Sequence, residues 1–126
     1  MNIADYFSSI ERSLEQYASI TSIEIIEVLA SDDFNGILRC RVHYWDESFL
    51  SIHETVSTEL GYPVRIVYSY SYIHNDQCVF RYDNAPHHPD IVTFPHHKHI
   101  GEDKIAPTDQ PAVNQILDEI GKYFNG

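Results

Sequence analysis

Five of the eight histidines in this chain fall between Phe80 and His99. Histidine side chains ordinarily titrate at about pH 6.5, so they donate and accept protons near neutrality, and they are also the commonest metal ligands. The segment is therefore compatible with acid–base catalysis and with metal binding. A third interpretation is that these histidines are solvated on a loop and carry no chemistry.

In the acid–base interpretation, one histidine takes a proton and another returns it, while Arg81 or Lys98 stabilises negative charge on a phosphate or carbonyl. Side chains two residues apart in a strand point to the same side, so Asp83 can hold the guanidinium of Arg81 in one orientation. The pair either orients a phosphate-binding arginine or forms only a structural salt bridge at the end of a strand.

In the metal interpretation, neutral imidazoles converge on a divalent ion, and Asp83 or Glu54 adds a carboxylate. The candidate nitrogen ligands are His87, His88, His96, His97 and His99. The spacing does not choose among them, because a helical turn and an extended segment bring different pairs together.

Glu54 lies on the otherwise apolar side of a predicted strand from Phe49 to Val56. Such a carboxylate is either paired or raised in pKa and available for proton transfer. We expect a basic or hydroxyl partner, because an unpaired buried charge is costly. On the following strand Tyr68, Tyr70 and Tyr72 share a side; their rings can stack on nucleobases, but we expect them to cover the sheet as core residues.

Hydrophobic spacing of three and four predicts helices over residues 3–17, capped by Asn2, and over residues 113–124. Alternation with period two predicts strands between them. We expect strands beginning near Ile23 and over residues 38–44, 49–56, 64–72 and 77–82, with a short one over 91–94, after which Pro95 ends regular pairing. The pattern predicts a single α+β domain over residues 1–126, an antiparallel β-sheet meander covered by N- and C-terminal helices.

The net charge of −11 disfavours nonspecific binding of nucleic acid over the whole surface. Five of the eight basic residues are nevertheless central in the chain, which permits a local basic surface: Arg39, Arg41, Arg65, Arg81 and Lys98. No apolar run has the length of about 18 residues typical of a membrane helix, and residues 1–10 do not resemble a signal peptide. Cys40 and Cys78 lack CxxC spacing, so we expect reduced thiols and a cytoplasmic protein.

The segment Phe80-Arg81-Tyr82-Asp83-Asn84-Ala85-Pro86-His87-His88, followed by Phe94-Pro95-His96-His97-Lys98-His99, resembles the TumE family. The likeness extends over roughly residues 22 to 120 and includes the strands around Ser48–Glu54 and Tyr68–Tyr72. Members of this family are regarded as toxin components of bacterial and archaeal toxin–antitoxin systems. The resemblance implies a DNA-binding antitoxin as partner, and growth inhibition in its absence. It points to Glu54, Arg81, Asp83, Asn84, His87, His96, Lys98 and His99.

Together these observations predict a toxin that acts on RNA as a metal-independent ribonuclease, with no cofactor. The predicted catalytic residues are Glu54, Arg81, Asp83, His87, His96, Lys98 and His99. The predicted substrate contacts are Asn84, Tyr70, Arg39 and Arg41. Two alternatives stay open, a metal-binding or metal-dependent hydrolase that uses the histidine cluster, and a non-catalytic module whose histidine loop forms a homodimer or partner contact.

Overall fold

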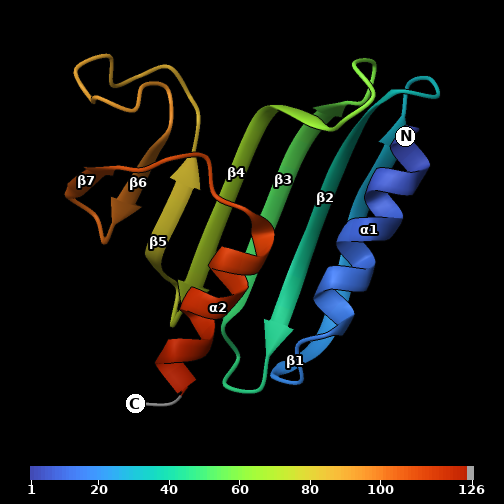
Figure 1. The fold of residues 1–126 in the computed structure, drawn as a ribbon. Helices are drawn as coiled ribbons and strands as arrows, with labels where there is room; N and C mark the ends of the chain where they lie inside the picture. The colour runs from blue at the N-terminus through green and yellow to red at the C-terminus, as the bar shows by residue number, and fades with distance from the viewer. Residues whose placement is uncertain (125–126) are drawn as a thin grey trace.

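The computed structural model describes residues 1–124 and contains one seven-stranded sheet and two helices (Figure 1). The elements are α1 (Ile3–Glu15), β1 (Ile20–Ala30), β2 (Asn35–Tyr44), β3 (Phe49–Ser57), β4 (Val64–His74), β5 (Gln77–Asp83), β6 (His97–Ile100), β7 (Lys104–Pro107) and α2 (Val113–Phe124). Each strand pairs with the next along the chain, and every pair is antiparallel. The expected α+β meander is confirmed.

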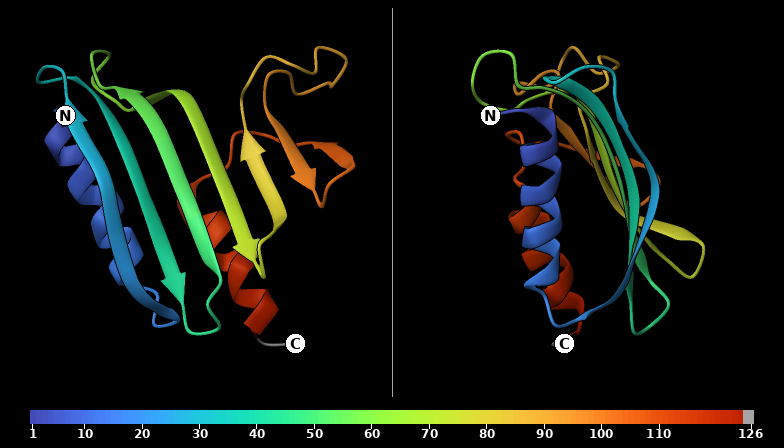
Figure 2. Two further views of the ribbon diagram at one scale, coloured as in Figure 1. Left: turned by 180° about the vertical axis from the view of Figure 1, so that it is seen from behind. Right: turned by 90° about the vertical axis from the view of Figure 1, so that its right-hand side faces the viewer.

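The sheet curves around both helices, which pack on the same side of it (Figure 2). We call this side the helix face and the opposite side the open face. The start of α1 is fixed by a capping box, in which the Asn2 side chain accepts from the Asp5 backbone N–H and the Asp5 side chain accepts from the Asn2 backbone. α2 begins after Pro111 and buries the apolar positions of its helical stripe.

The core lies between the helices and β2 to β5. Alternate residues of these strands point into it, and Tyr68, Tyr70 and Tyr72 are each at most 1% exposed. The expected core role of these tyrosines is confirmed. Their rings belong to the same core cluster as Ile116, Leu117 and Ile120 of α2, which are also buried.

The open face carries two rows of polar residues that cross β2 to β6. Residues directly opposite each other in adjacent antiparallel strands point to the same side of the sheet. The first row is Arg41, Ser51, Ser71, Arg81 and His99, and the second is Arg39, His53, Ser69, Asp83 and His97. These two polar rows place the basic residues of β2 on the same surface as the histidines of β6.

The expected strand over residues 91–94 is wrong, because this segment consists of turns. The Ile91 N–H donates to the carbonyl of His88, and the Phe94 N–H donates to that of Ile91. Thr93 then fixes the loop, since its hydroxyl donates to the His96 carbonyl and accepts from the Thr108 N–H. Regular pairing resumes two residues after Pro95 in β6 and continues in β7, both of which the sequence interpretation missed.

Among the described residues, no helix has both the length and the apolar character needed to cross a membrane. Cys40 is buried and Cys78 half-buried, and both are free thiols, as expected.

Candidate functional site

Asp83, the last residue of β5, is a buried carboxylate with several partners. Its side chain accepts a hydrogen bond from Arg81 Nε at 2.8 Å on Oδ2 and from the backbone N–H of Ala85 at 3.0 Å on Oδ1. Oδ1 also lies 2.8 Å from Nε2 of His97. The residue is 4% exposed, so these contacts replace water around the charge. The expected Arg81–Asp83 pair is therefore present, and it fixes the direction of the guanidinium.

His97, at the start of β6, lies between two hydrogen-bond acceptors. Its Nδ1 is 2.9 Å from the carbonyl oxygen of Pro95, and its Nε2 faces Asp83. A carbonyl and a carboxylate both accept hydrogen bonds, so each ring nitrogen of His97 faces an acceptor. At 2% exposed, His97 holds Asp83 in place from the side opposite to Arg81.

His99 is suited to accept a proton. Its Nε2 lies 3.4 Å from Nη2 of Arg81 and 3.5 Å from Oδ2 of Asp83. Burial and the nearby Arg81 charge lower the pKa of His99 below its ordinary value of 6.5, and the Asp83 charge opposes this shift. The lowered pKa favours the neutral ring, the form that accepts a proton, and Nε2 lies between the guanidinium of Arg81 and the carboxylate of Asp83.

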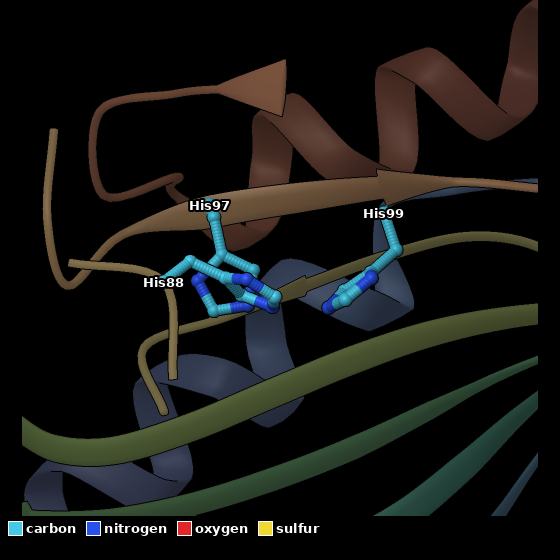
Figure 3. A group of neighbouring side chains, drawn as sticks. All are labelled: His88, His97 and His99. Carbon is cyan, nitrogen blue, oxygen red and sulfur yellow. The ribbon is translucent and has the colours of Figure 1, made fainter. Parts of the chain in front are cut away.

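His88 joins these two histidines from the loop that follows β5. The rings of His88, His97 and His99 meet edge to face, with centroids 4.9 Å apart for His88–His97 and His97–His99 and 5.8 Å apart for His88–His99. One nitrogen from each ring lies within 4.8 Å of the other two, and Figure 3 shows the three rings converging. We call these three residues the histidine trio.

Lys98 and His96 lie away from the trio, although they are its neighbours in sequence. Lys98 points to the helix face, where its Nζ donates to Glu119 of α2 at 2.7 Å. Burial alone lowers the pKa of Lys98, but its contacts with Glu119 and Tyr82 raise it above the ordinary value. The ring of His96 stacks on Tyr68, and its Nδ1 lies 2.7 Å from the hydroxyl of that tyrosine.

Glu54 is completely buried on the helix face, where two hydroxyls bind it. Tyr6 of α1 donates to Glu54 at 2.5 Å, and Tyr70 donates to its other oxygen. Arg65 in turn donates to the Tyr70 hydroxyl at 2.8 Å. The expectation of a basic or hydroxyl partner is confirmed, whereas Arg81 lies on the opposite face of the sheet. Glu54 and Tyr70 thus connect α1 to the sheet.

Two further predicted residues occupy the loop after β5. The side chain of Asn84 accepts from the Tyr68 N–H and donates to the Ile66 carbonyl, so it extends the pairing of β4 where β5 ends. His87, which directly precedes His88 in the sequence, is exposed. Neither side chain reaches Asp83 in the contacts of the described residues.

Arg39 and Arg41 are exposed on β2, at the far end of the two polar rows. With His53, Ser51 and Ser69 they line a hollow of about 380 Å³ on the open face. Burial and the Arg39 charge lower the pKa of His53. Two strands, β3 and β4, lie between these arginines on β2 and Asp83 on β5, a separation of about 14 Å or three strand spacings.

The structure therefore joins Arg81, Asp83 and His99 among the predicted catalytic residues and adds His88 and His97. The last two appeared in the sequence only as possible metal ligands. The sequence did contain a signal for His97, because side chains two residues apart in an extended segment point to the same side, and His97 therefore lies on the side of His99. His88 offered none, since its position depends on the turns of residues 84–96.

In a scan against protein-family models, residues 10–124 match the family described as Toxin TumE. No curated protein and no solved structure matches the chain in the corresponding searches. The matched range includes all seven strands, α2 and the whole Arg81–Asp83–histidine arrangement. On this near-complete match the chain belongs to the Toxin TumE family.

Proposed function

We propose that this toxin acts in the cytoplasm on RNA and cleaves it without a metal, by acid–base chemistry at Asp83, Arg81 and the histidine trio. The family match supports a toxin role. The observation that carries the proposed reaction is the placement of His99 Nε2, 3.4 Å from Nη2 of an arginine that a buried aspartate orients. RNA suits such a site, because its own 2′-hydroxyl attacks the adjacent phosphate once deprotonated, so only proton transfer and charge stabilisation are required.

In the proposed reaction, Nε2 of His99 takes the proton of the 2′-hydroxyl. The resulting oxygen attacks the neighbouring phosphorus and forms a cyclic 2′,3′-phosphate as the bond to the 5′-oxygen breaks. His88, half-buried in the loop after β5, donates a proton to that leaving oxygen. Arg81 stabilises the charge on the phosphate, while His97 and Asp83 hold the guanidinium in place.

The polar rows supply a path for the substrate. Arg39 and Arg41 are exposed, and no carboxylate of the described residues forms an ion pair with either guanidinium. Phosphate groups 5′ or 3′ of the cleaved bond would bind there, because exposed guanidinium groups attract phosphate regardless of sequence. In the first polar row, the small hydroxyl side chains of Ser51 and Ser71 lie between Arg41 and Arg81 and leave room for a single strand.

The test is an RNA cleavage assay in EDTA with protein purified without a histidine tag. We expect cleavage by the parent protein, and loss of about 100-fold or more in Arg81→Ala and His99→Ala. His43→Ala is the matched control, because His43 also lies on the open face but pairs with Glu24 far from Asp83. Absence of cleavage by a folded parent protein that still arrests growth would overturn the proposed reaction.

A separate measurement addresses the toxin role in cells. Expression of the chain is induced with and without its neighbouring gene, and growth is followed. We expect arrest with the chain alone and rescue with the neighbouring gene. Arrest that persists in Arg81→Ala would place toxicity outside this site.

A further inference from the structure

The histidine trio lies beside the buried carboxylate of Asp83. Nε2 of His97 lies 2.8 Å from Oδ1 of Asp83, and Nε2 of His99 lies 3.5 Å from Oδ2 of the same carboxylate. The third ring, His88, offers a nitrogen within 4.8 Å of the other two. Three lone-pair donors and one carboxylate therefore meet in a small volume.

The orientation of His97 is typical of a metal ligand. A ligating histidine almost always donates its second ring N–H to a carboxylate or backbone carbonyl, which fixes the tautomer and directs the other nitrogen at the ion. In His97, Nδ1 makes this contact with the Pro95 carbonyl at 2.9 Å, so Nε2, which faces Asp83 Oδ1 at 2.8 Å, is the nitrogen that would bind an ion in place of a proton. Asp83 faces the same nitrogen, so its carboxylate lies beside the position of an ion bound there.

The same residues suit some ions better than others. Three imidazoles favour borderline transition metals such as Zn²⁺ over Mg²⁺ and Ca²⁺, which prefer oxygen ligands. Arg81 adds an unfavourable positive charge nearby, but its Nε is already paired with Asp83 at 2.8 Å. The carboxylate therefore offsets the guanidinium at the position where an ion would bind.

We propose that His88, His97 and His99 bind one Zn²⁺ ion per chain, with Asp83 as the adjacent carboxylate. This site stands independently of the RNA reaction proposed above. It also predicts a regulatory consequence for that reaction, because the ion takes the lone pairs of His88 and His99 that proton transfer needs. Zn²⁺ would then inhibit metal-independent cleavage.

Adjacent histidines supply a matched pair of variants for the test. His88→Ala removes one proposed ligand, whereas His87→Ala removes an exposed neighbour outside the trio. Tag-free protein is stripped with EDTA, dialysed and titrated with ZnCl₂ by calorimetry, and with CoCl₂ by visible absorption as a report of coordination geometry. We expect one ion per chain in the parent and in His87→Ala. In His88→Ala and His99→Ala we expect affinity to fall by about 10-fold or more.

Equal affinities for His87→Ala and His88→Ala, or less than one ion per folded chain, would overturn the site. The proposed cleavage is tested independently of the zinc site, because it is measured in EDTA without any added ion. Cleavage in EDTA together with inhibition by stoichiometric ZnCl₂ supports both proposals. Cleavage that appears only when Zn²⁺ is added supports the site and overturns the metal-independent reaction.

Discussion

At the residue scale, Arg81 and Lys98 are cations in different environments. Arg81 lies on the open face, where Asp83 orients it beside His99, whereas Lys98 lies on the helix face and binds Glu119. Both are chemically able to bind phosphate, but only Arg81 belongs to the arrangement that carries the proposed reaction. The residue type alone does not say which of the two cations lies beside the histidines. The alternation of side chains along β5 and β6 decides it.

Replacing each of these cations separates the two environments. We expect Arg81→Ala to lower toxicity and RNA cleavage by about 100-fold or more, because a charge partner of the transition state is lost. We expect Lys98→Ala to keep the cleavage rate within a few-fold and to lower the free energy of unfolding by about 1 kcal/mol or less, since its ion pair is partly solvated. Growth, cleavage and urea denaturation would be measured on both variants. Equal loss of cleavage in two folded variants would contradict the distinction.

Three histidines give stability a defined pH dependence. Burial, aided by a nearby arginine, lowers the pKa of His53, His96 and His99 below the ordinary value of 6.5. Below that value the unfolded chain binds protons that the folded chain does not yet bind, so acid favours unfolding. We expect the free energy of unfolding, measured with urea in EDTA, to fall from pH 7.5 to pH 5.5. In His53→Gln the free energy of unfolding should change less between these two pH values. A parent protein that is more stable at pH 5.5 than at pH 7.5 would contradict this account.

At the scale of elements, the sequence predicted both helices, five of the strands and their antiparallel order. These elements have long periodic patterns, such as the alternation from Leu38 to Tyr44. The four-residue strands β6 and β7 lack one: β6 begins two residues after Pro95, and its identity depends on pairing with β5. The Arg81–Asp83 pair was predictable because it lies within one strand. The position of His88 was not, because turns fixed by distant contacts such as Thr93 with Thr108 determine it.

The contact between α1 and the sheet gives an element-scale prediction for stability. Tyr6 and Tyr70 are the hydroxyl donors to the buried Glu54 among the described residues. We expect Tyr6→Phe to lower the free energy of unfolding by about 1 to 3 kcal/mol, because it removes a donor from a buried charge. The matched control Tyr62→Phe removes the hydroxyl of an exposed tyrosine and should change stability by less than about 0.5 kcal/mol. Urea denaturation of both variants measures these free energies of unfolding. Equally small effects would show that the Tyr6 hydroxyl does not stabilise the buried Glu54.

At the scale of the whole molecule, charge is unevenly distributed over an acidic chain of net charge −11. The open face carries the exposed side chains of Arg39, Arg41 and Arg81, with Glu24 and Glu27 of β1 opposite the first two, whereas Glu11 and Glu15 are exposed on α1. An acidic protein is therefore able to attract a phosphate chain to one face while repelling it elsewhere. The same local field would attract an acidic protein segment.

The DNA-binding antitoxin that the family resemblance implies is the subject of the last prediction. If an acidic segment of the antitoxin covers the open face, substrate and inhibitor compete for Arg39 and Arg41, and the DNA-binding part stays free. We expect Arg39→Glu with Arg41→Glu to weaken antitoxin binding by about 10-fold or more. The charge-reversal control, Glu11→Lys with Glu15→Lys on α1, should leave antitoxin affinity unchanged.

Calorimetry at two salt concentrations tests whether antitoxin binding is electrostatic, because exposed charges are screened beyond about 8 Å at physiological ionic strength. Parent affinity should therefore fall with salt and approach that of the arginine variants. Unchanged affinity in folded arginine variants would place the antitoxin on another surface and leave the histidine trio uncovered.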